Sequence, residues 1–278
     1  MSTYNDKSNT VTILGSGTST GIPIIGCKCS VCLSENPKDK RLRTSILIET
    51  KSNKTILVDT TPDFRTQALR AKIDHVDGAI ITHDHADHVH GIDDLRPLCF
   101  GPPPRNIPVF VEKNIKEHLE EKFPYIFKRE SYFSKGRPIL GGGIPKLDLH
   151  EVKINQEEKI LEEDFIFFSL PHGHTNSLGF YHQGFAYIID CESIPEEVLA
   201  KLEGLKVDLL IIDCVKSGTH NTHLTFEKAR DYIERTKPKR AGLIHMGHGL
   251  GHEQLEKMCN EIKCSDVFPT YDEQKLKY

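Results

Sequence analysis

Three histidines and two aspartates lie within seven residues, in the stretch Thr82-His83-Asp84-His85-Ala86-Asp87-His88. An apolar run typical of a buried strand, residues 78–81, comes directly before it. Imidazole and carboxylate groups are suitable ligands for Zn²⁺, Mn²⁺ or Fe, and a loop at a strand end can aim neighbouring side chains at different points. The first two histidines could hold one ion, and Asp87 with His88 a second. The stretch therefore predicts a metal-binding loop.

A second group of metal-ligand residues lies after Gly26, where Cys27, Cys29 and Cys32 form a C-x-C-x-x-C pattern. The other five cysteines are isolated, and we interpret most of them as small buried apolar side chains. Thiolates are typical of structural zinc sites, which need four ligands in a tetrahedron. The triplet predicts such a site with its fourth ligand from a distant segment, and the alternative is a redox or incidental thiol cluster.

Further candidate ligands follow later apolar runs, in Leu170-Pro171-His172-Gly173-His174, Ile189-Asp190-Cys191 and Leu243-Ile244-His245-Met246-Gly247-His248. Burying the carboxylate of Asp190 would be costly unless it were paired or bound to a metal, and a strand-terminal or capping acid is the alternative. His245 and His248 are three residues apart on one loop, so each can point to a different site. This loop can therefore supply the fourth ligand for the cysteines.

Alternating strands and helices are predicted to position these groups. Apolar runs predict strands at 11–14, 45–49, 55–59, 79–82, 107–111, 152–154, 165–170, 179–182, 185–190, 209–213 and 240–245. Helices are predicted at 63–72, 114–123, 195–202 and 224–236, with a helix or turn at 91–96 and a lid or crossover at 125–143. Two halves that each combine strands with outer helices predict an α/β fold, an αββα sandwich of two mixed sheets flanked by helices.

Composition favours one globular domain over residues 10–278, after a disordered leader at residues 1–9. The chain has 36 Lys and Arg against 40 Asp and Glu, so its charge gives no broad reason to expect nucleic acid. No apolar run approaches the roughly 20 residues that span a bilayer, which excludes a membrane span. The start of the chain lacks the apolar core of a secretory signal, which favours the cytoplasm.

The stretch from Thr82 to His88 resembles the Thr-His-x-His-x-Asp-His signature of the metallo-β-lactamase fold superfamily, and the resemblance spans nearly the whole chain. A narrower resemblance is to the cyclic phosphodiesterase branch, whose type member opens phosphoribosyl 1,2-cyclic phosphate. It rests on Gly15-Ser16-Gly17-Thr18-Ser19, Gly26-Cys27-Lys28-Cys29-Ser30-Val31-Cys32, Gly91-Ile92-Asp93-Asp94-Leu95-Arg96 and His245-Met246-Gly247-His248.

The resemblance implies two catalytic divalent ions, Zn or Mn, and one structural Zn. It assigns the ligands as His83, His85 and His172 for the first ion, Asp87, His88 and His245 for the second, and Asp190 as the bridge. It also implies that His248 joins Cys27, Cys29 and Cys32 around the structural zinc. His172 is preferred over His174 because of the His-Gly step that follows it.

Two neighbouring ions would activate a hydroxide and bind the oxygens of a phosphodiester. The resemblance therefore implies hydrolysis of a small cyclic sugar phosphate, with Asp87 in the catalytic set. The departing alkoxide would benefit from a proton donor, for which we predict His223 and, as the alternative, His220. Asp213 is predicted to orient a metal-binding histidine, or else to be a turn acid.

The sequence is also compatible with other functions. The same metal centre could serve an RNA-processing phosphodiesterase or a thioester or lactam hydrolase, because a fold does not determine a substrate. A non-enzymatic zinc protein, with the cysteine site anchoring an interaction surface, is a further alternative. A small phosphodiester is the predicted partner, nucleic acid is disfavoured, and a homodimer is left open.

Overall fold

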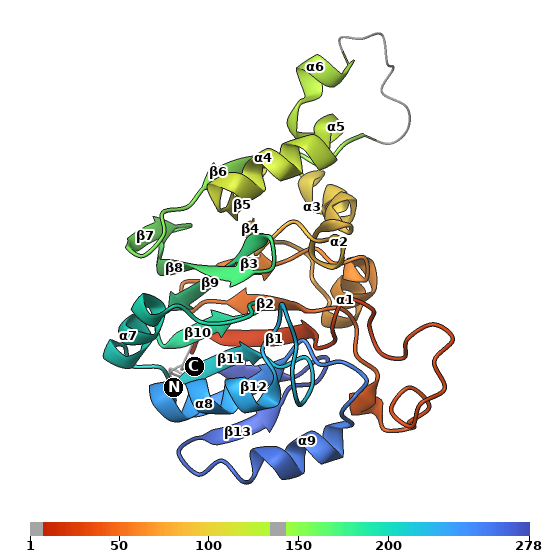
Figure 1. Ribbon diagram of the computed structural model, residues 1–278. Helices are drawn as coiled ribbons and strands as arrows, with labels where there is room; N and C mark the ends of the chain where they lie inside the picture. The colour runs from red at the N-terminus through yellow and green to blue at the C-terminus, as the bar shows by residue number, and fades with distance from the viewer. Residues whose placement is uncertain (1–7, 134–142) are drawn as a thin grey trace, which may run out of the picture.

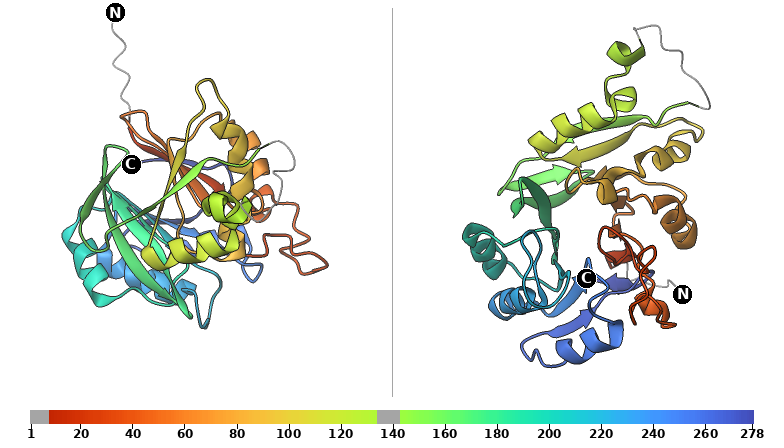
Figure 2. Two further views of the ribbon diagram at one scale, coloured as in Figure 1. Left: turned by 90° about the horizontal axis from the view of Figure 1, so that it is seen from above. Right: turned by 45° about the vertical axis from the view of Figure 1, so that its right-hand side comes forward.

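The computed structural model describes residues 8–133 and 143–278, which form two sheets of seven strands each. The sheets face one another, with helices on both outer sides (Figure 1). Figure 2 shows the same layers from two further directions, with α5 and α6 projecting beyond the sandwich. The αββα sandwich predicted from the sequence is confirmed.

The first sheet has the order β14-β1-β2-β3-β4-β5-β6, with β1 Thr10–Gly15, β2 Ser45–Glu49, β3 Thr55–Val58, β4 Gly78–Ile80, β5 Ile107–Val111, β6 Leu147–Glu151 and β14 Lys275–Lys277. The second has the order β13-β12-β11-β10-β9-β8-β7, with β7 Glu157–Ile160, β8 Glu163–His172, β9 Thr175–His182, β10 Phe185–Ile188, β11 Leu209–Asp213, β12 Arg240–Ile244 and β13 Asp266–Pro269. The helices are α1 Phe64–Ala71, α2 Ala86–Val89, α3 Arg96–Cys99, α4 Lys113–Lys122, α5 Pro124–Phe127, α6 Arg129–Phe133, α7 Glu196–Gly204, α8 Phe226–Thr236 and α9 His252–Cys259, with 3-10 turns at Pro37–Asp39 and Ile92–Leu95.

Alternation along the strands separates the core into layers. On β2, Ile46 and Ile48 pack between the two sheets, whereas Leu47 packs under the helices on the outer side. On β10, Tyr187 faces the space between the sheets and Ile188 faces the other helical layer. Successive side chains point to opposite faces of a strand, so a strand covered on both faces needs apolar residues throughout. This explains the continuous apolar runs that the sequence shows here.

Several element boundaries differ from the sequence prediction. The strand predicted at 152–154 is wrong, because the strand lies at 147–151 and residue 154 makes only an isolated bridge. β7, β13 and β14 were missed, as was α9. The three missed strands are short, and β7 and β14 each contain a single apolar residue among charged ones. The predicted lid or crossover at 125–143 contains α5 and α6, and its residues 134–142 lie outside the described residues.

The predicted leader lies mostly outside the described residues, but Asn9 is ordered and buried. Its side-chain oxygen accepts a hydrogen bond from Lys51 N at 2.8 Å, and its carbonyl accepts one from Tyr278 N at 3.1 Å. The first strand β1 pairs with the last strand β14. The assignment of residue 9 to a disordered leader is therefore wrong, and the two ends of the described chain lie side by side.

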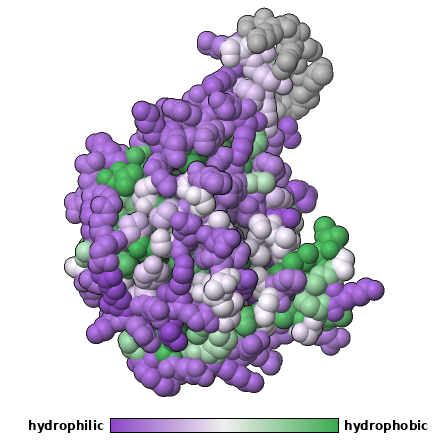
Figure 3. Space-filling view, viewed as in Figure 1, coloured by the Kyte–Doolittle hydropathy of each residue, from purple (hydrophilic) through white to green (hydrophobic). Residues whose placement is uncertain are grey.

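The surface in the view of Figure 3 is mostly hydrophilic, with a hydrophobic patch over the segment that protrudes between β1 and β2. Ile25 and Leu33 in that segment are 99% and 64% exposed. Within residues 8–133 and 143–278, no helix is long and apolar enough to cross a membrane.

A buried polar network closes the sandwich at the start of β8, at the opposite end of that strand from His172. His182 is fully buried, and its Nε2 donates to Glu163 Oε2 at 3.1 Å. Its Nδ1 lies 2.8 Å from the hydroxyl of Tyr278. Burial lowers the pKa of His182, so the ring is neutral at pH 7 and Nδ1 accepts the Tyr278 proton.

Replacing Tyr278 with phenylalanine is expected to lower the free energy of unfolding by about 1–3 kcal/mol, because the buried Nδ1 of His182 loses its donor. Urea unfolding at pH 7 measures the effect. The control is Tyr181→Phe, whose hydroxyl donates to the exposed carbonyl of Lys206. Water can replace that bond, so the control should change stability by no more than about 0.5 kcal/mol. Equal losses in both variants would contradict this account of the network.

Candidate metal centre

The ligand residues predicted from the sequence meet at one edge of the sandwich, where several strands end. His172 is the last residue of β8, Asp190 follows β10, and His245 follows β12. β10 and β12 run parallel on either side of β11, and β8 runs in the same direction because both β8 and β10 are antiparallel to β9. The loop 82–88 follows β4 in the facing sheet. Both sheets therefore deliver polar side chains to the same place.

One group consists of His83, His85 and His172, with one nitrogen of each ring within 4.8 Å of the others. His172 Nε2 lies 3.2 Å from His85 Nδ1, and His172 Nδ1 donates to Thr222 O at 2.8 Å. That bond leaves the other ring nitrogen of His172 directed at the group. His174, the alternative considered from the sequence, is exposed.

A second group brings together Asp87, His88, Asp190 and His245, again with ligand atoms within 4.8 Å of one another. His88 Nε2 lies 3.2 Å from Asp87 Oδ2, and His245 Nε2 lies 3.8 Å from the same oxygen. His88 and His245 come from facing sheets, and their rings stack with centroids 5.9 Å apart. The group therefore forms only when the two sheets are packed face to face.

Asp190 joins the two groups. Its Oδ2 lies 3.3 Å from His88 Nε2 and 3.4 Å from His245 Nε2. The same oxygen lies 3.6 Å from His83 Nε2 and 4.0 Å from His172 Nε2. A single buried carboxylate oxygen thus faces ring nitrogens of both groups, which is the position that a bridging ligand would occupy.

The unsatisfied polar atoms of the centre fit a metal site. Within the described parts of the chain, the Nε2 atoms of His83, His88 and His245 are buried without a hydrogen-bond partner, as is Asp190 Oδ1. A buried polar atom without a partner costs free energy, so such atoms are rare in folded proteins. Several of them directed at one point are the expected donor set for divalent cations.

The charge states of Asp190 and His83 suit cation binding. Burial alone would raise the pKa of Asp190, but the facing rings of His245 and His88 lower it well below its usual value. Burial lowers the pKa of His83 well below its usual value. The carboxylate is therefore ionised and the His83 ring is neutral, which are the states that bind metals.

Three residues at strand ends in the centre have left-handed backbone conformations. These are Asp59, Asp190 and His245, with φ of 64°, 46° and 61°. Such a conformation costs a residue other than glycine about 1–3 kcal/mol, and it persists when the surrounding structure enforces it. Here it turns the side chain out of the strand direction and into the centre.

Asp59, which follows β3, supports the centre and was not singled out from the sequence. Its Oδ1 accepts Thr82 N at 2.8 Å, and its Oδ2 accepts Thr82 Oγ1 and His88 Nδ1, each at 2.8 Å. The bond to Nδ1 fixes the His88 ring with Nε2 directed at Asp190. The available signal was an acid directly after a buried strand, the same signal that identified Asp190.

Asp59→Asn is expected to weaken divalent-metal binding at the centre by about 10- to 100-fold, since the ring of His88 loses the carboxylate that orients it. Competition with a chelator measures the affinity. Asp63→Asn is the control, because Asp63 directly precedes α1 and pairs with Arg43 outside the centre. A metal affinity equal to that of the wild-type protein would show that the ring needs no such support.

Asp213, the last residue of β11, holds a further histidine beside the two groups. His223 Nδ1 donates to Asp213 Oδ2 at 3.1 Å, and His245 Nδ1 lies 3.7 Å from Asp213 Oδ1. Burial lowers the pKa of His223, but the carboxylate of Asp213 outweighs burial and raises it to about 9. A ring nitrogen of His223 also lies within 4.8 Å of ligand atoms of His172 and Asp190.

His220, the alternative to His223, is placed differently. Its ring centroid is 5.0 Å from that of His223, and its Nδ1 accepts Thr222 N at 3.3 Å. Burial lowers the pKa of His220. A neutral ring without an adjacent carboxylate bond is a poorer proton donor at pH 7 than the ring of His223.

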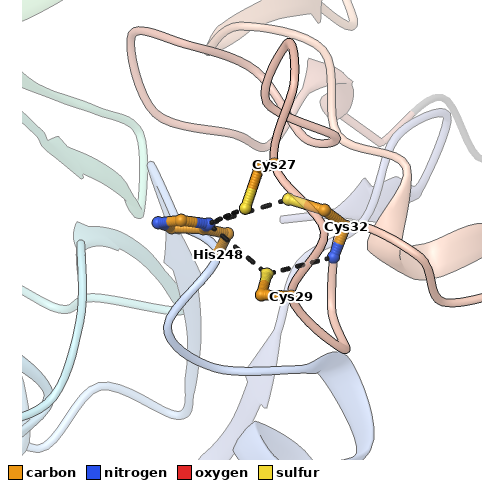
Figure 4. A group of neighbouring side chains, drawn as sticks. All are labelled: Cys27, Cys29, Cys32 and His248. Atoms are coloured by element: carbon orange, nitrogen blue, oxygen red, sulfur yellow. Dashed lines mark hydrogen bonds between the residues drawn. The ribbon is translucent and has the colours of Figure 1, made fainter.

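The cysteine triplet also meets its expected partner. The Sγ atoms of Cys27, Cys29 and Cys32 lie 3.4, 3.5 and 3.7 Å from His248 Nδ1, and Figure 4 shows them gathered around the ring. The backbone N–H of Cys32 donates to Cys29 Sγ and, against burial, lowers the pKa of the Cys29 thiol to about 6. Three sulfurs and one imidazole, one of the thiols readily ionised, form the donor set of a closed zinc site.

Residues 54–246 match the family model described as the Beta-lactamase superfamily domain. A solved structure described as a diphosphatase from the PhnP family is 33% identical, with a TM-score of 0.84, over 97% of this chain and 98% of that one. Zn²⁺-bound PqqB from Methylobacterium extorquens has a TM-score of 0.73 over 97% of this chain and 100% of that one. Its identity is 17%, so that likeness concerns the fold alone.

A curated relative from Porphyromonas gingivalis, named octanoyltransferase, is 36% identical over 261 residues. The alignment covers 94% of this chain but only 50% of the relative. The chain thus spans about half the length of that protein.

Proposed function

The chain belongs to the metallo-β-lactamase superfamily and to its PhnP family, and we propose that it is a two-metal phosphodiesterase that opens a small cyclic sugar phosphate. The observation that carries the proposal is the position of Asp190 Oδ2, which faces His83 and His172 on one side and His88 and His245 on the other. The relative described as a diphosphatase supports hydrolysis at phosphorus.

The first ion is assigned to His83, His85 and His172, and the second to Asp87, His88 and His245, with Asp190 between them. When bound, two divalent ions activate water and stabilise the charge that develops on phosphoryl oxygens. Histidine and carboxylate ligands accept either Zn²⁺ or Mn²⁺. The structural zinc is assigned to Cys27, Cys29, Cys32 and His248.

His223 is assigned as the proton donor to the leaving oxygen. Asp213 fixes its ring through Nδ1, which leaves Nε2 as the nitrogen that can donate a proton. The same carboxylate raises the pKa of His223, and cations bound nearby would lower it again. The two opposing effects bring the pKa of His223 toward 7, and a general acid is most effective when its pKa is near the operating pH.

A cyclic sugar phosphate suits this arrangement of groups. Opening its ring expels a sugar alkoxide, which is a poor leaving group and gains from protonation. The five-membered ring of a 1,2-cyclic phosphate is strained, so hydrolysis needs less help at phosphorus than in a linear diester. Phosphoribosyl 1,2-cyclic phosphate is therefore the leading substrate.

Phosphorus NMR of phosphoribosyl 1,2-cyclic phosphate, incubated with metal-loaded protein, tests the proposal. The control is Asp87→Ala, which removes one assigned ligand. Ring opening by the wild-type protein alone would support it. If the cyclic phosphate ring remains unhydrolysed while metal analysis finds both catalytic ions, this compound is excluded as the substrate. A dialkyl diphosphate and an RNA 3′ end then distinguish the remaining phosphorus chemistry.

Hydrolysis of an acyl ester or thioester is the second candidate, favoured by the relative named octanoyltransferase. The chain matches only half of that relative, so the name applies to a protein twice as long. Release of thiol from an octanoyl thioester, followed with a thiol reagent, tests this activity. Turnover of the thioester together with inert phosphodiesters would reverse the order of the two candidates.

A further inference from the structure

Arg41 is buried to 1% exposure, although nothing in the proposed reaction uses it. A charged guanidinium is costly to bury unless its donors are satisfied. Nothing in the sequence distinguishes it, because it lies in the basic segment Lys38-Asp39-Lys40-Arg41 that reads as solvent-exposed. The hydrogen bonds of Arg41 indicate which segments its buried side chain holds in place.

The guanidinium of Arg41 donates to four acceptors, which lie in two segments, residues 245–250 and residues 38–39. Its Nη1 donates to Gly247 O at 3.0 Å, and its Nη2 donates to Leu250 O at 3.0 Å. The same Nη2 donates to Asp39 Oδ1 at 2.9 Å, and Nε donates to Lys38 O at 3.3 Å. The planar fork of the guanidinium thus holds backbone carbonyls and a carboxylate at the same time.

The first of these segments is residues 245–250, here called the ligand loop. It carries His245, assigned to the catalytic centre, and His248, assigned to the structural zinc. Arg41 binds the carbonyl immediately before His248 and the carbonyl two residues after it. The Asp39 oxygen that pairs with Arg41 also accepts His252 N at 2.8 Å, just beyond the loop. The loop is therefore fixed on both sides of its zinc ligand.

The backbone of Arg41 is tied to the cysteine segment. Arg41 and Ile22 exchange two backbone hydrogen bonds, each of 2.8 Å. Ile22 is buried in a small apolar cluster with Val31 and Cys32. Arg41 thus connects two segments. Its backbone is hydrogen-bonded to residues 22–32, the segment that carries the three cysteines, and its side chain is hydrogen-bonded to the ligand loop.

We propose, on the basis of the metal loading proposed above, that Arg41 is a positioning residue that couples the cysteine–histidine site to the catalytic centre through the ligand loop. Zinc at the first site orders the loop around His248, and Arg41 keeps the same loop in the register that directs His245 at Asp190. Coupling of this kind is reciprocal, so each site strengthens metal binding at the other.

Arg41→Lys tests the positioning role, because the ammonium group keeps the charge but cannot span carbonyls arranged for a planar fork. Cobalt titration of the metal-free protein reads both sites without substrate. Thiolate charge-transfer absorption reports the cysteine site, and the remaining d–d absorption reports the catalytic centre. We expect cobalt affinity about tenfold weaker or worse at both sites, as for other residues that orient ligands.

Cys27→Ser tests the coupling itself, alone and combined with Arg41→Lys. The single Cys27→Ser variant should weaken cobalt binding at the catalytic centre, and the double variant should show a smaller additional loss than the single effects predict. Arg129→Lys is the matched control, because Arg129 also donates to two backbone carbonyls, of Ile126 and Pro145, but lies in α6. Its cobalt affinities should equal those of the wild-type protein.

A folded Arg41→Lys protein with wild-type cobalt affinity at the catalytic centre would overturn the proposal. Strictly additive effects of Arg41→Lys and Cys27→Ser would overturn the coupling as well. If circular dichroism shows that Arg41→Lys is unfolded, Asp39→Asn replaces it, because this variant weakens the hold on Nη2 and leaves three carbonyl acceptors. Cobalt binding is read without turnover, so failure of the proposed phosphodiesterase activity would leave this test valid.

Discussion

Asp190→Asn is expected to reduce hydrolysis about a thousandfold and to leave the protein unable to retain two catalytic ions. Asparagine has the same size and tolerates the left-handed conformation of residue 190, so the change removes only the negative charge. That charge faces four imidazole nitrogens, and two cations sharing one carboxylate would lose their common ligand. Several kcal/mol of transition-state stabilisation correspond to about a thousandfold in rate.

Steady-state kinetics on the substrate identified by NMR, with metal analysis of the same samples, measure the effect. The control is Asp208→Asn. Asp208 directly precedes β11, at the end of that strand remote from Asp213 and the metal centre, and it pairs with Lys239. The control variant should retain both ions and full activity. Two ions retained by Asp190→Asn, with unchanged kcat, would mean that the bridging assignment is wrong.

His223→Asn is expected to reduce kcat about 10²- to 10⁴-fold for a substrate with a sugar alkoxide leaving group. With a nitrophenyl diester, the loss should be within about tenfold, because nitrophenolate departs without a proton. The ratio of the two losses separates proton donation from general damage to the centre. His220→Asn is the comparison variant and should affect both substrates equally and weakly.

Metal content distinguishes the other possible role of His223. One of its ring nitrogens is close enough to His172 and Asp190 to join them around an ion. If His223→Asn loses an ion and slows both substrates to the same extent, His223 is a ligand and the proton comes from elsewhere. Full metal content with a loss confined to the alkoxide substrate supports the assignment as the acid.

The residues that gather at the candidate metal centre could be predicted because polar residues directly after apolar strands are conspicuous in a sequence. The pairing of His223 with Asp213 was only partly foreseen: the sequence suggested that Asp213 orients a metal-binding histidine, and the structure gives it His223 as well as His245. Asp59 carried the same strand-end signal as Asp190. It was missed because it was interpreted only as the last residue of the predicted strand 55–59.

The remaining differences have a tertiary origin. β6 forms beside β5 through a parallel register that joins Ile107 to Leu147, and a parallel pairing between distant segments leaves no turn signal. Arg41 could not be predicted to be buried, because two of its four acceptors are backbone carbonyls of a loop some two hundred residues away. Local patterns identify strands and ligands, whereas partners that are backbone atoms have no sequence signature.

The pairing of β1 with β14 places the two ends of the described chain next to each other. Tyr278 lies against Phe185, the first residue of β10, with ring centroids 5.0 Å apart, whereas Asp190 follows the other end of that strand. Five residues of strand separate the two points by roughly 16 Å. A polypeptide joined to either end would therefore be attached near the start of β10, remote from Asp190 and the candidate metal centre. A second domain attached there by a short linker would begin away from the candidate metal centre.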